Sequence, residues 1–400
     1  MAQPQFTKIT KYGLLMISLL HFSMSKASEI AKDQMKEQKV EQFKKVKEMN
    51  YRGVVYDVGL QFSPGPFSVD PFNPEQVKHD MQVIAKELHA NSVRIEGEEI
   101  QRLVVATEAA HAAGLKVLFN PWKMNADAPQ TIDYMAEAAV EAEKLRKKGV
   151  DLIFVAGCEY TIFSQGAFPG ETFNERVMFM VTNGGAPGHG QEKTPAMDEA
   201  NKKLNEILAK ICEGVRANFK GKITYSSGTW EEVNWNLFDI VGMDYYRRGE
   251  PEQEYIAKLE KYKSDKPLLV MEVGSCAYEG AGALGDGGFI AFQGVNPDGT
   301  VIYKDNVTPV RSEKEQADYV ETQVNLLSKS SADGVFIYVF AFPIMPFSEE
   351  IGKDMDMTSY ALVKTYPKHD PRFQKIPNWE YKEAFHRLSK VYGKMAEAQK

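Results

Sequence analysis

The chain has 400 residues, of which 43% are hydrophobic and 26% charged, a composition typical of soluble globular proteins that excludes disordered, collagen-like and disulfide-scaffold chains. Its 48 basic and 55 acidic side chains give a formal net charge of −7, and no basic block indicates a nucleic-acid partner. Three scattered cysteines predict no disulfide framework, and the seven histidines lack metal-ligand spacing.

The first 27 residues have the pattern of a secretory signal peptide. Lys8 and Lys11 precede a short apolar run at 12–22, and Ser25-Lys26-Ala27 places small residues before a cleavage point. The run is too short to span a bilayer, although a frayed helix or a retained anchor at a lipid surface would also fit it. We therefore expect cleavage after Ala27, a mature charge of −10 because three lysines leave, and a secreted or periplasmic protein without a membrane span.

A charged segment at 28–50 predicts a solvated helix or linker that leads into a single domain at 51–395. In this domain short apolar runs alternate with amphipathic ones. The runs predict buried strands at 52–58, 91–96, 115–120, 151–157, 222–227, 238–245, 267–272 and 334–341. Apolar residues spaced by three and four predict helices at 75–90, 99–113, 131–148, 197–215, 252–263, 313–330 and 380–395.

Eight strands that alternate with helices predict a (β/α)8 TIM barrel. The alternative is a doubly wound open sheet, which usually has a Gly-rich phosphate-binding turn after its first strand. Here the first predicted strand leads into a Pro-rich loop without that pattern. Two connections, 160–195 and 273–312, are long enough to indicate functional loops, and in a barrel both would lie at the carboxyl ends of the strands.

Two glutamates stand where the fourth and seventh predicted strands end. Glu159 follows the fourth strand and Glu272 ends the seventh, so both should project from the same end of the barrel. One such glutamate is usually an ordinary exposed strand-end residue. A pair is the requirement of glycoside hydrolysis, in which one carboxyl group donates a proton and the other attacks or activates water.

Four motifs resemble the clan of retaining glycoside hydrolases whose acid/base ends strand four and whose nucleophile ends strand seven. They are FVAGCEY at 154–160, KPLLVMEVG at 266–274, NSVRIEG at 91–97 and FDIVGMDYY at 238–246. The resemblance covers 51 to about 390. It implies that Glu159 is the acid/base and Glu272 the nucleophile, that Arg94 supports the nucleophile, and that Tyr245 donates a hydrogen bond to it.

Other residues receive supporting roles with ordinary structural alternatives. Arg94 would keep Glu272 ionised, or would form an ion pair with Glu96 or Asp57 inside the barrel mouth. Tyr245 could equally be a satisfied barrel tyrosine. Trp122 and Trp230 follow the third and fifth strands, where they could stack on sugar rings or pack in the core.

The sequence departs from the clan at two positions. The clan usually has an asparagine before the acid/base that binds the sugar 2-hydroxyl, and here the residue is Cys158, a poor donor and acceptor. The eighth strand usually ends near a tryptophan, and here residues 338–342 read YVFAF. A disulfide between Cys158 and Cys276 is conceivable in a secreted protein, but two buried thiols are the expectation because strands four and seven are not neighbours.

The sequence thus predicts a retaining glycosidase that acts on a β-linked oligosaccharide or polysaccharide without a metal or organic cofactor. The first alternative is a non-catalytic carbohydrate-binding barrel that has lost turnover. The second is a barrel lyase or aldolase, which would need a Schiff-base lysine, for which only Lys123 stands near a strand end.

Overall fold

The computed structural model describes residues 49–62, 64–185 and 192–398. The predicted signal peptide and nearly all of the charged segment at 28–50 lie outside these residues. Within them, eight strands form one parallel sheet in the order β5-β4-β3-β2-β1-β10-β7-β6. The strands are β1 (Tyr51–Asp57), β2 (Ser92–Gly97), β3 (Lys116–Pro121), β4 (Leu152–Cys158), β5 (Lys222–Ser226), β6 (Val241–Asp244), β7 (Leu268–Val273) and β10 (Gly334–Ile337).

The sheet closes into a barrel where β5 meets β6. A parallel bridge joins Ser227 to Met243, and the backbone N–H of Asp244 donates to the carbonyl of Ser227 at 2.8 Å. Gly242 permits this approach, because a Cβ atom there would lie 2.3 Å from the carbonyl oxygen of Tyr225. The fold is therefore the predicted TIM barrel rather than an open doubly wound sheet.

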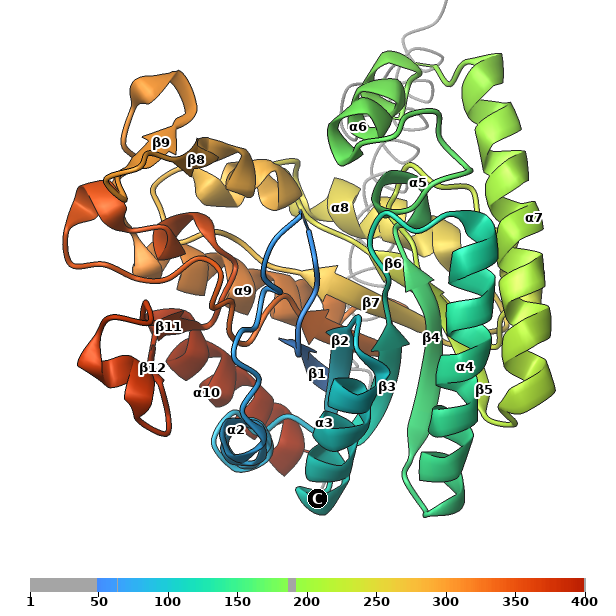
Figure 1. Cartoon of the computed structure of the whole chain (residues 1–400), viewed down its shortest axis with the longest axis horizontal. Helices are drawn as coiled ribbons and strands as arrows, with labels where there is room; N and C mark the ends of the chain where they lie inside the picture. The colour runs from blue at the N-terminus through green and yellow to red at the C-terminus, as the bar shows by residue number, and fades with distance from the viewer. Residues whose placement is uncertain (1–48, 63, 186–191, 399–400) are drawn as a thin grey trace, which may run out of the picture. The chain divides into compact units, whose positions relative to one another are not determined.

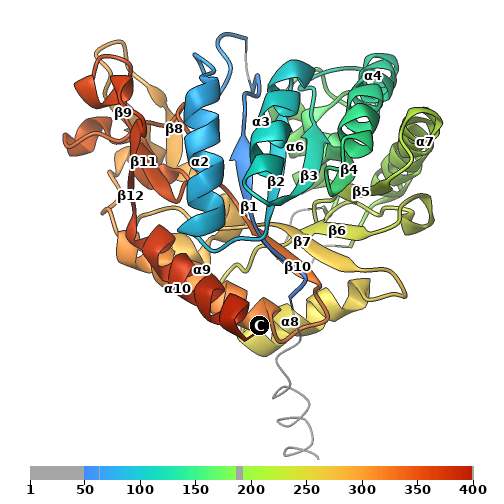
Figure 2. The ribbon, with the colours of Figure 1, turned by 90° about the horizontal axis from the view of Figure 1, so that it is seen from below.

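Amphipathic helices surround the strands (Figure 2). They are α2 (Pro74–Lys86), α3 (Ile100–Ala112), α4 (Ala128–Lys147), α7 (Pro195–Asn218), α8 (Glu252–Leu259), α9 (Glu313–Leu327) and α10 (Glu383–Glu397), each close to its predicted range. After β5 there is a single 3₁₀ turn, Trp235–Leu237, as its short connection indicates. Among the residues that the structure describes, no helix combines the length and apolarity needed to cross a membrane.

The two long connections contain short elements of their own. The first holds α5 (Tyr160–Phe163) and α6 (Phe173–Thr182), which lie beyond the carboxyl end of β4 (Figure 1). The second follows β7 and holds a hairpin of β8 (Phe292–Val295) and β9 (Val301–Tyr303). A second hairpin, β11 (Val363–Thr365) with β12 (Trp379–Tyr381), precedes α10.

The barrel interior changes from apolar to polar toward the carboxyl ends of the strands. Val55, Leu118 and Phe336 belong to one buried apolar cluster that draws residues from five of the strands. Side chains alternate along a strand, so the inward positions two residues after Val55 and Leu118 are Asp57 and Asn120, paired in register with Glu96 between them. A packed apolar interior therefore ends in a layer of polar side chains at the barrel mouth.

Candidate active site

Arg94 organises the polar layer from inside the barrel. Its fully buried guanidinium donates from Nε to Asn120 Oδ1 at 2.8 Å and from Nη1 to Glu272 Oε1 at 2.8 Å. Its Nη2 forms an ion pair with Glu96 Oε2 at 3.2 Å. Both sequence interpretations of Arg94 thus describe real contacts: it supports Glu272 and it pairs with Glu96. Burial alone would lower the pKa of Arg94, but the surrounding acidic groups outweigh burial and raise it well above its usual range.

Donors on both sides hold the carboxylate of Glu272 in one orientation. Besides the Arg94 bond to Oε1, the hydroxyl of Tyr246 donates to Oε2 at 3.0 Å. The side chain belongs to β7 and the residue is only 7% exposed. A charge-assisted bond from a guanidinium is stronger than a neutral one, so these contacts fix the orientation of the Glu272 carboxylate.

The hydrogen bond expected from Tyr245 is made by its neighbour, so that prediction was wrong. The Tyr245 hydroxyl donates instead to the carbonyl of Tyr255 at 2.6 Å, and the two rings stack 4.7 Å apart. The reason is the alternation of side chains, since Asp244 at the end of β6 points into the barrel and Tyr245 must then point outward. Tyr246, the next residue, returns to the inside.

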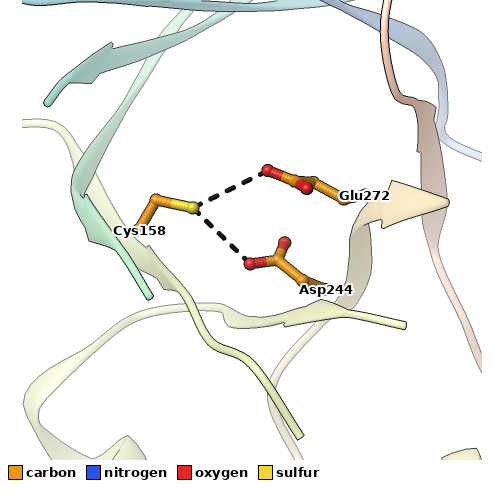
Figure 3. A group of neighbouring side chains, drawn as sticks. All are labelled: Cys158, Asp244 and Glu272. Atoms are coloured by element: carbon orange, nitrogen blue, oxygen red, sulfur yellow. Dashed lines mark hydrogen bonds between the residues drawn. The ribbon is translucent and has the colours of Figure 1, made fainter. Parts of the chain in front are cut away.

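The thiol of Cys158 points toward two carboxylates (Figure 3). Its thiol Sγ is 3.6 Å from Asp244 Oδ2 and 3.7 Å from Glu272 Oε1. Burial, and then the Asp244 charge, raise the pKa of this thiol well above its usual range, so it is a protonated donor. Cys276 is free as well and donates to the carbonyl of Thr358 at 3.1 Å, so the two cysteines form no disulfide.

Asp244 is a buried carboxyl group that the sequence analysis did not select. Ser226 Oγ donates to its Oδ1 at 2.6 Å, and it pairs in register with Glu272. Burial, and then the Glu272 charge, raise its pKa well above its usual range. The sequence feature that could have identified Asp244 is an acidic residue at the end of an apolar strand, at a position whose side chain points into the barrel.

Three ligand atoms, from Cys158, Asp244 and Glu272, lie within 4.8 Å of one another, close enough for one metal ion to bridge them. The Arg94 guanidinium already contacts both carboxylates, at 2.8 Å from Glu272 and 3.9 Å from Asp244. This cation supplies the positive charge that the pair requires, and we assign no metal to the group.

Glu159 stands at the end of β4 in an unusual backbone conformation. Its φ of 41° and ψ of 46° are left-handed, and its side chain is partly exposed at the barrel mouth. Burial first, and then the charges of Asp244 and Glu272, raise the pKa of Glu159 well above its usual range. A raised pKa favours the protonated form of a carboxyl group, which is the form that can donate a proton.

Asp57 completes the acidic layer at the end of β1. The backbone N–H of Gly59 donates to its Oδ1 at 2.7 Å. Burial raises the pKa of Asp57 to about 6, against which this bond and nearby donors act. Asp57 pairs in register with Glu96 at the barrel mouth. The ion pairs of Arg94 in the described part of the chain are with Glu96, Asp244 and Glu272, so the alternative of an Arg94–Asp57 pair is not realised.

The two tryptophans for which sugar stacking and core packing were both open are packed. Trp122 is 4% exposed and meets the ring of Phe163 edge-on at 4.9 Å. Trp230 is 6% exposed, and its indole N–H donates to Thr161 Oγ1 at 3.0 Å. Neither offers a free face, so the structure supports the packing alternative for both.

Partly exposed aromatic side chains do line the mouth from other loops. The Phe62 ring lies 6.4 Å from that of Phe163 and 5.9 Å from that of Phe342, so one row joins the loops after β1, β4 and β10. Tyr338 follows β10, and burial first, and then the charges of Glu96 and Glu272, raise its pKa well above its usual range. It occupies the strand end where the resembling clan has its tryptophan.

No protein-family model and no curated protein matches the sequence. Solved structures do match the fold. A GH113 β-1,4-mannanase is similar over 87% of this chain and 99% of its own, with 15% identity and a TM-score of 0.53. The GH113 β-mannanase AaManA from Alicyclobacillus acidocaldarius matches over 86% and 97%, with 16% identity and a TM-score of 0.52.

Bacteroides uniformis β-glucuronidase 2 is similar over 86% of this chain at 12% identity, with a TM-score of 0.52. This chain spans only 35% of that longer protein. At these identities the similarity concerns the fold. The chain has the TIM-barrel fold of these glycoside hydrolases, as its strand motifs predict.

Proposed function

We propose that this protein is a retaining glycoside hydrolase that cleaves a β-linked glycoside or polysaccharide by double displacement, outside the cytoplasm. The observation that carries the proposal is the contrast between two carboxyl groups at one barrel mouth. Glu272 receives charged and neutral donors, whereas Glu159 has a raised pKa and a partly exposed side chain. Two carboxyl groups in such different environments at one site are typical of an acid and nucleophile pair.

In the first step Glu159 gives its proton to the glycosidic oxygen as the bond from that oxygen to the anomeric carbon breaks. A carboxylate oxygen of Glu272 forms the new bond to that carbon and gives a glycosyl ester. In the second step Glu159, now ionised, takes a proton from water. The water oxygen attacks the anomeric carbon and the ester bond to Glu272 breaks, which returns both residues to their starting states.

The site also suggests how a sugar would be held without the clan's asparagine. The Cys158 thiol is directed at Asp244 and Glu272, so the hydrogen bonds to the sugar hydroxyls would come from other residues at the barrel mouth. Tyr338 and the row formed by Phe62, Phe163 and Phe342 supply partly exposed aromatic surface for sugar C–H faces.

The experiment is a screen followed by trapping. Aryl β-mannosides, β-glucuronides, β-glucosides and β-galactosides, together with β-1,4-mannan, are tested first, since the similar folds include a mannanase and a glucuronidase. The accepted sugar is then supplied as its 2-deoxy-2-fluoro 2,4-dinitrophenyl glycoside, and peptide mass spectrometry locates the ester.

We expect the label on Glu272 and a first-formed product that keeps the β configuration. An α product would contradict the retaining mechanism. Oligosaccharide binding without any turnover would favour the non-catalytic barrel, which two observations support: Cys158 stands where the clan has asparagine, and the end of the eighth strand lacks the clan's tryptophan.

A further inference from the structure

The turn that carries Glu159 is fixed by three consecutive backbone donors. The N–H of Glu159 donates to the carbonyl of Ser226 at 2.8 Å, and the N–H of Tyr160 donates to the hydroxyl of Tyr225 at 2.7 Å. The N–H of Thr161 donates to Glu231 Oε1 at 3.1 Å. Two of the acceptors belong to β5 and the third, Glu231, to the loop that follows it, so β5 and this loop together hold the turn.

Glu231 is the centre of this arrangement. The residue is 5% exposed, and its carboxylate accepts from Thr161 Oγ1 at 2.8 Å, from Tyr225 Oη at 3.0 Å and from Ser227 Oγ at 3.2 Å. The Tyr225 hydroxyl accepts from the N–H of Tyr160 and donates to Glu231. The carboxyl group of Glu231 therefore holds two of the three donors in the turn, Thr161 directly and Tyr160 through Tyr225. An ionised carboxyl group only accepts hydrogen bonds, which matches a cage built from donors. These donors act against burial, which raises the pKa of Glu231 to about 7.

The conformation of the turn needs such support. Glu159 has a left-handed backbone conformation, which residues other than glycine rarely adopt. Such a conformation persists only where the surrounding structure holds it in place. Loss of the bonds to Tyr160 and Thr161 would let the turn relax. The side chain of Glu159 would then move relative to Glu272, which is held independently by Arg94 and Tyr246.

We propose that Glu231 is a positioning residue for Glu159: it holds the turn from 159 to 161 so that the acid/base carboxyl group reaches the leaving-group oxygen. The inference rests on the proposed function and extends it to a residue that does not touch the substrate. It predicts a specific defect, the loss of proton donation with the nucleophile left intact.

The variant Glu231→Gln tests this with a series of aryl β-glycosides of one accepted sugar, whose phenols range from very acidic to weakly acidic. Acidic phenols leave without a proton, so their kcat/KM should stay within about threefold of wild type. Weakly acidic phenols need the acid, and their kcat/KM should fall by at least about tenfold.

Glu143→Gln is the matched control, because it changes another buried carboxylate, on α4, which accepts from Arg146 Nε at 2.8 Å and from the Lys220 N–H at 3.1 Å. It should leave the dependence of kcat/KM on the phenol unchanged. If Glu231→Gln fails to fold, Tyr225→Phe replaces it, since this variant keeps Glu231 and removes its link to Tyr160.

The outcomes separate the two proposals. An equal loss for every phenol, or no loss at all, in a protein whose wild type is active would overturn the positioning role and leave the hydrolase intact. A wild type that hydrolyses no glycoside would overturn both. A loss confined to weakly acidic phenols supports Glu231 as the support of the acid/base.

Discussion

The neighbouring tyrosines Tyr245 and Tyr246 provide a matched pair that tests how Glu272 is held. Tyr246→Phe removes only the hydroxyl that donates to Glu272 Oε2 at 3.0 Å. A hydrogen bond to a charged group contributes about 1.5–3 kcal/mol. If that bond orients the carboxylate during attack, kcat/KM should fall about 10- to 150-fold.

Tyr245→Phe is the same chemical change one residue earlier. It removes a bond to the neutral carbonyl of Tyr255, whose contribution is about 0.5–1.5 kcal/mol of folding stability. We expect kcat/KM near that of wild type and a melting temperature lower by about 1–2 °C. Steady-state kinetics on an accepted aryl glycoside and thermal unfolding measure both effects. A loss of activity in Tyr245→Phe equal to or larger than that in Tyr246→Phe would refute the assignment.

Three further predictions address the acid, the pH dependence and export. Glu159→Ala should still react with glycosides of acidic phenols, and azide should speed its turnover and yield a β-glycosyl azide, detected by mass spectrometry and NMR; absence of the azide product would remove Glu159 from the acid/base role. Asp57 has a raised pKa, about 6 against 3.8, so its stabilising contribution is complete below pH 3.8 and is lost as the pH rises to about 6, at a cost of about 3 kcal/mol. Asp57→Asn should therefore gain stability relative to wild type between these values in denaturant titrations, and a difference that does not change with pH would contradict the cause. In its native cell the mature protein should begin at Ser28, as intact mass of the extracytoplasmic fraction would show, whereas full-length protein in the cytosol would refute export.

The fold was predictable because its signals are local. A strand buried on both faces is a continuous apolar run, so the runs that end at Glu159 and Glu272 marked strands four and seven nearly to the residue. The same logic placed both glutamates at one end of the barrel. Arg94 was predictable for the same reason, as a charged residue inside an apolar strand must find partners in the interior.

The remaining site depended on information that local patterns lack. Which of Tyr245 and Tyr246 faces Glu272 depends on where β6 ends, and a shift of one residue reverses the side-chain direction. The contact of Cys158 with Asp244 joins residues 86 positions apart. The sequence does not reveal whether an aromatic residue after a strand has a free face, so sugar stacking and core packing both stayed open for Trp122 and Trp230, which are packed.

The junction of β5 with β6 has a consequence for how the molecule opens. Here the strands are joined by an isolated bridge at Ser227 and Met243, whereas neighbouring pairs share continuous ladders of several residues. Amide hydrogens at this junction should exchange with solvent through smaller openings than those between β1, β2 and β3. Such an opening separates Ser226 on β5 from Asp244 on β6. It also parts the β4–β5 side of the barrel, which carries Glu159, from the β6–β7 side, which carries Glu272. Local unfolding would thus take apart the proposed catalytic arrangement in the same cooperative event, and a ligand that contacts both Glu159 and Glu272 would oppose the opening.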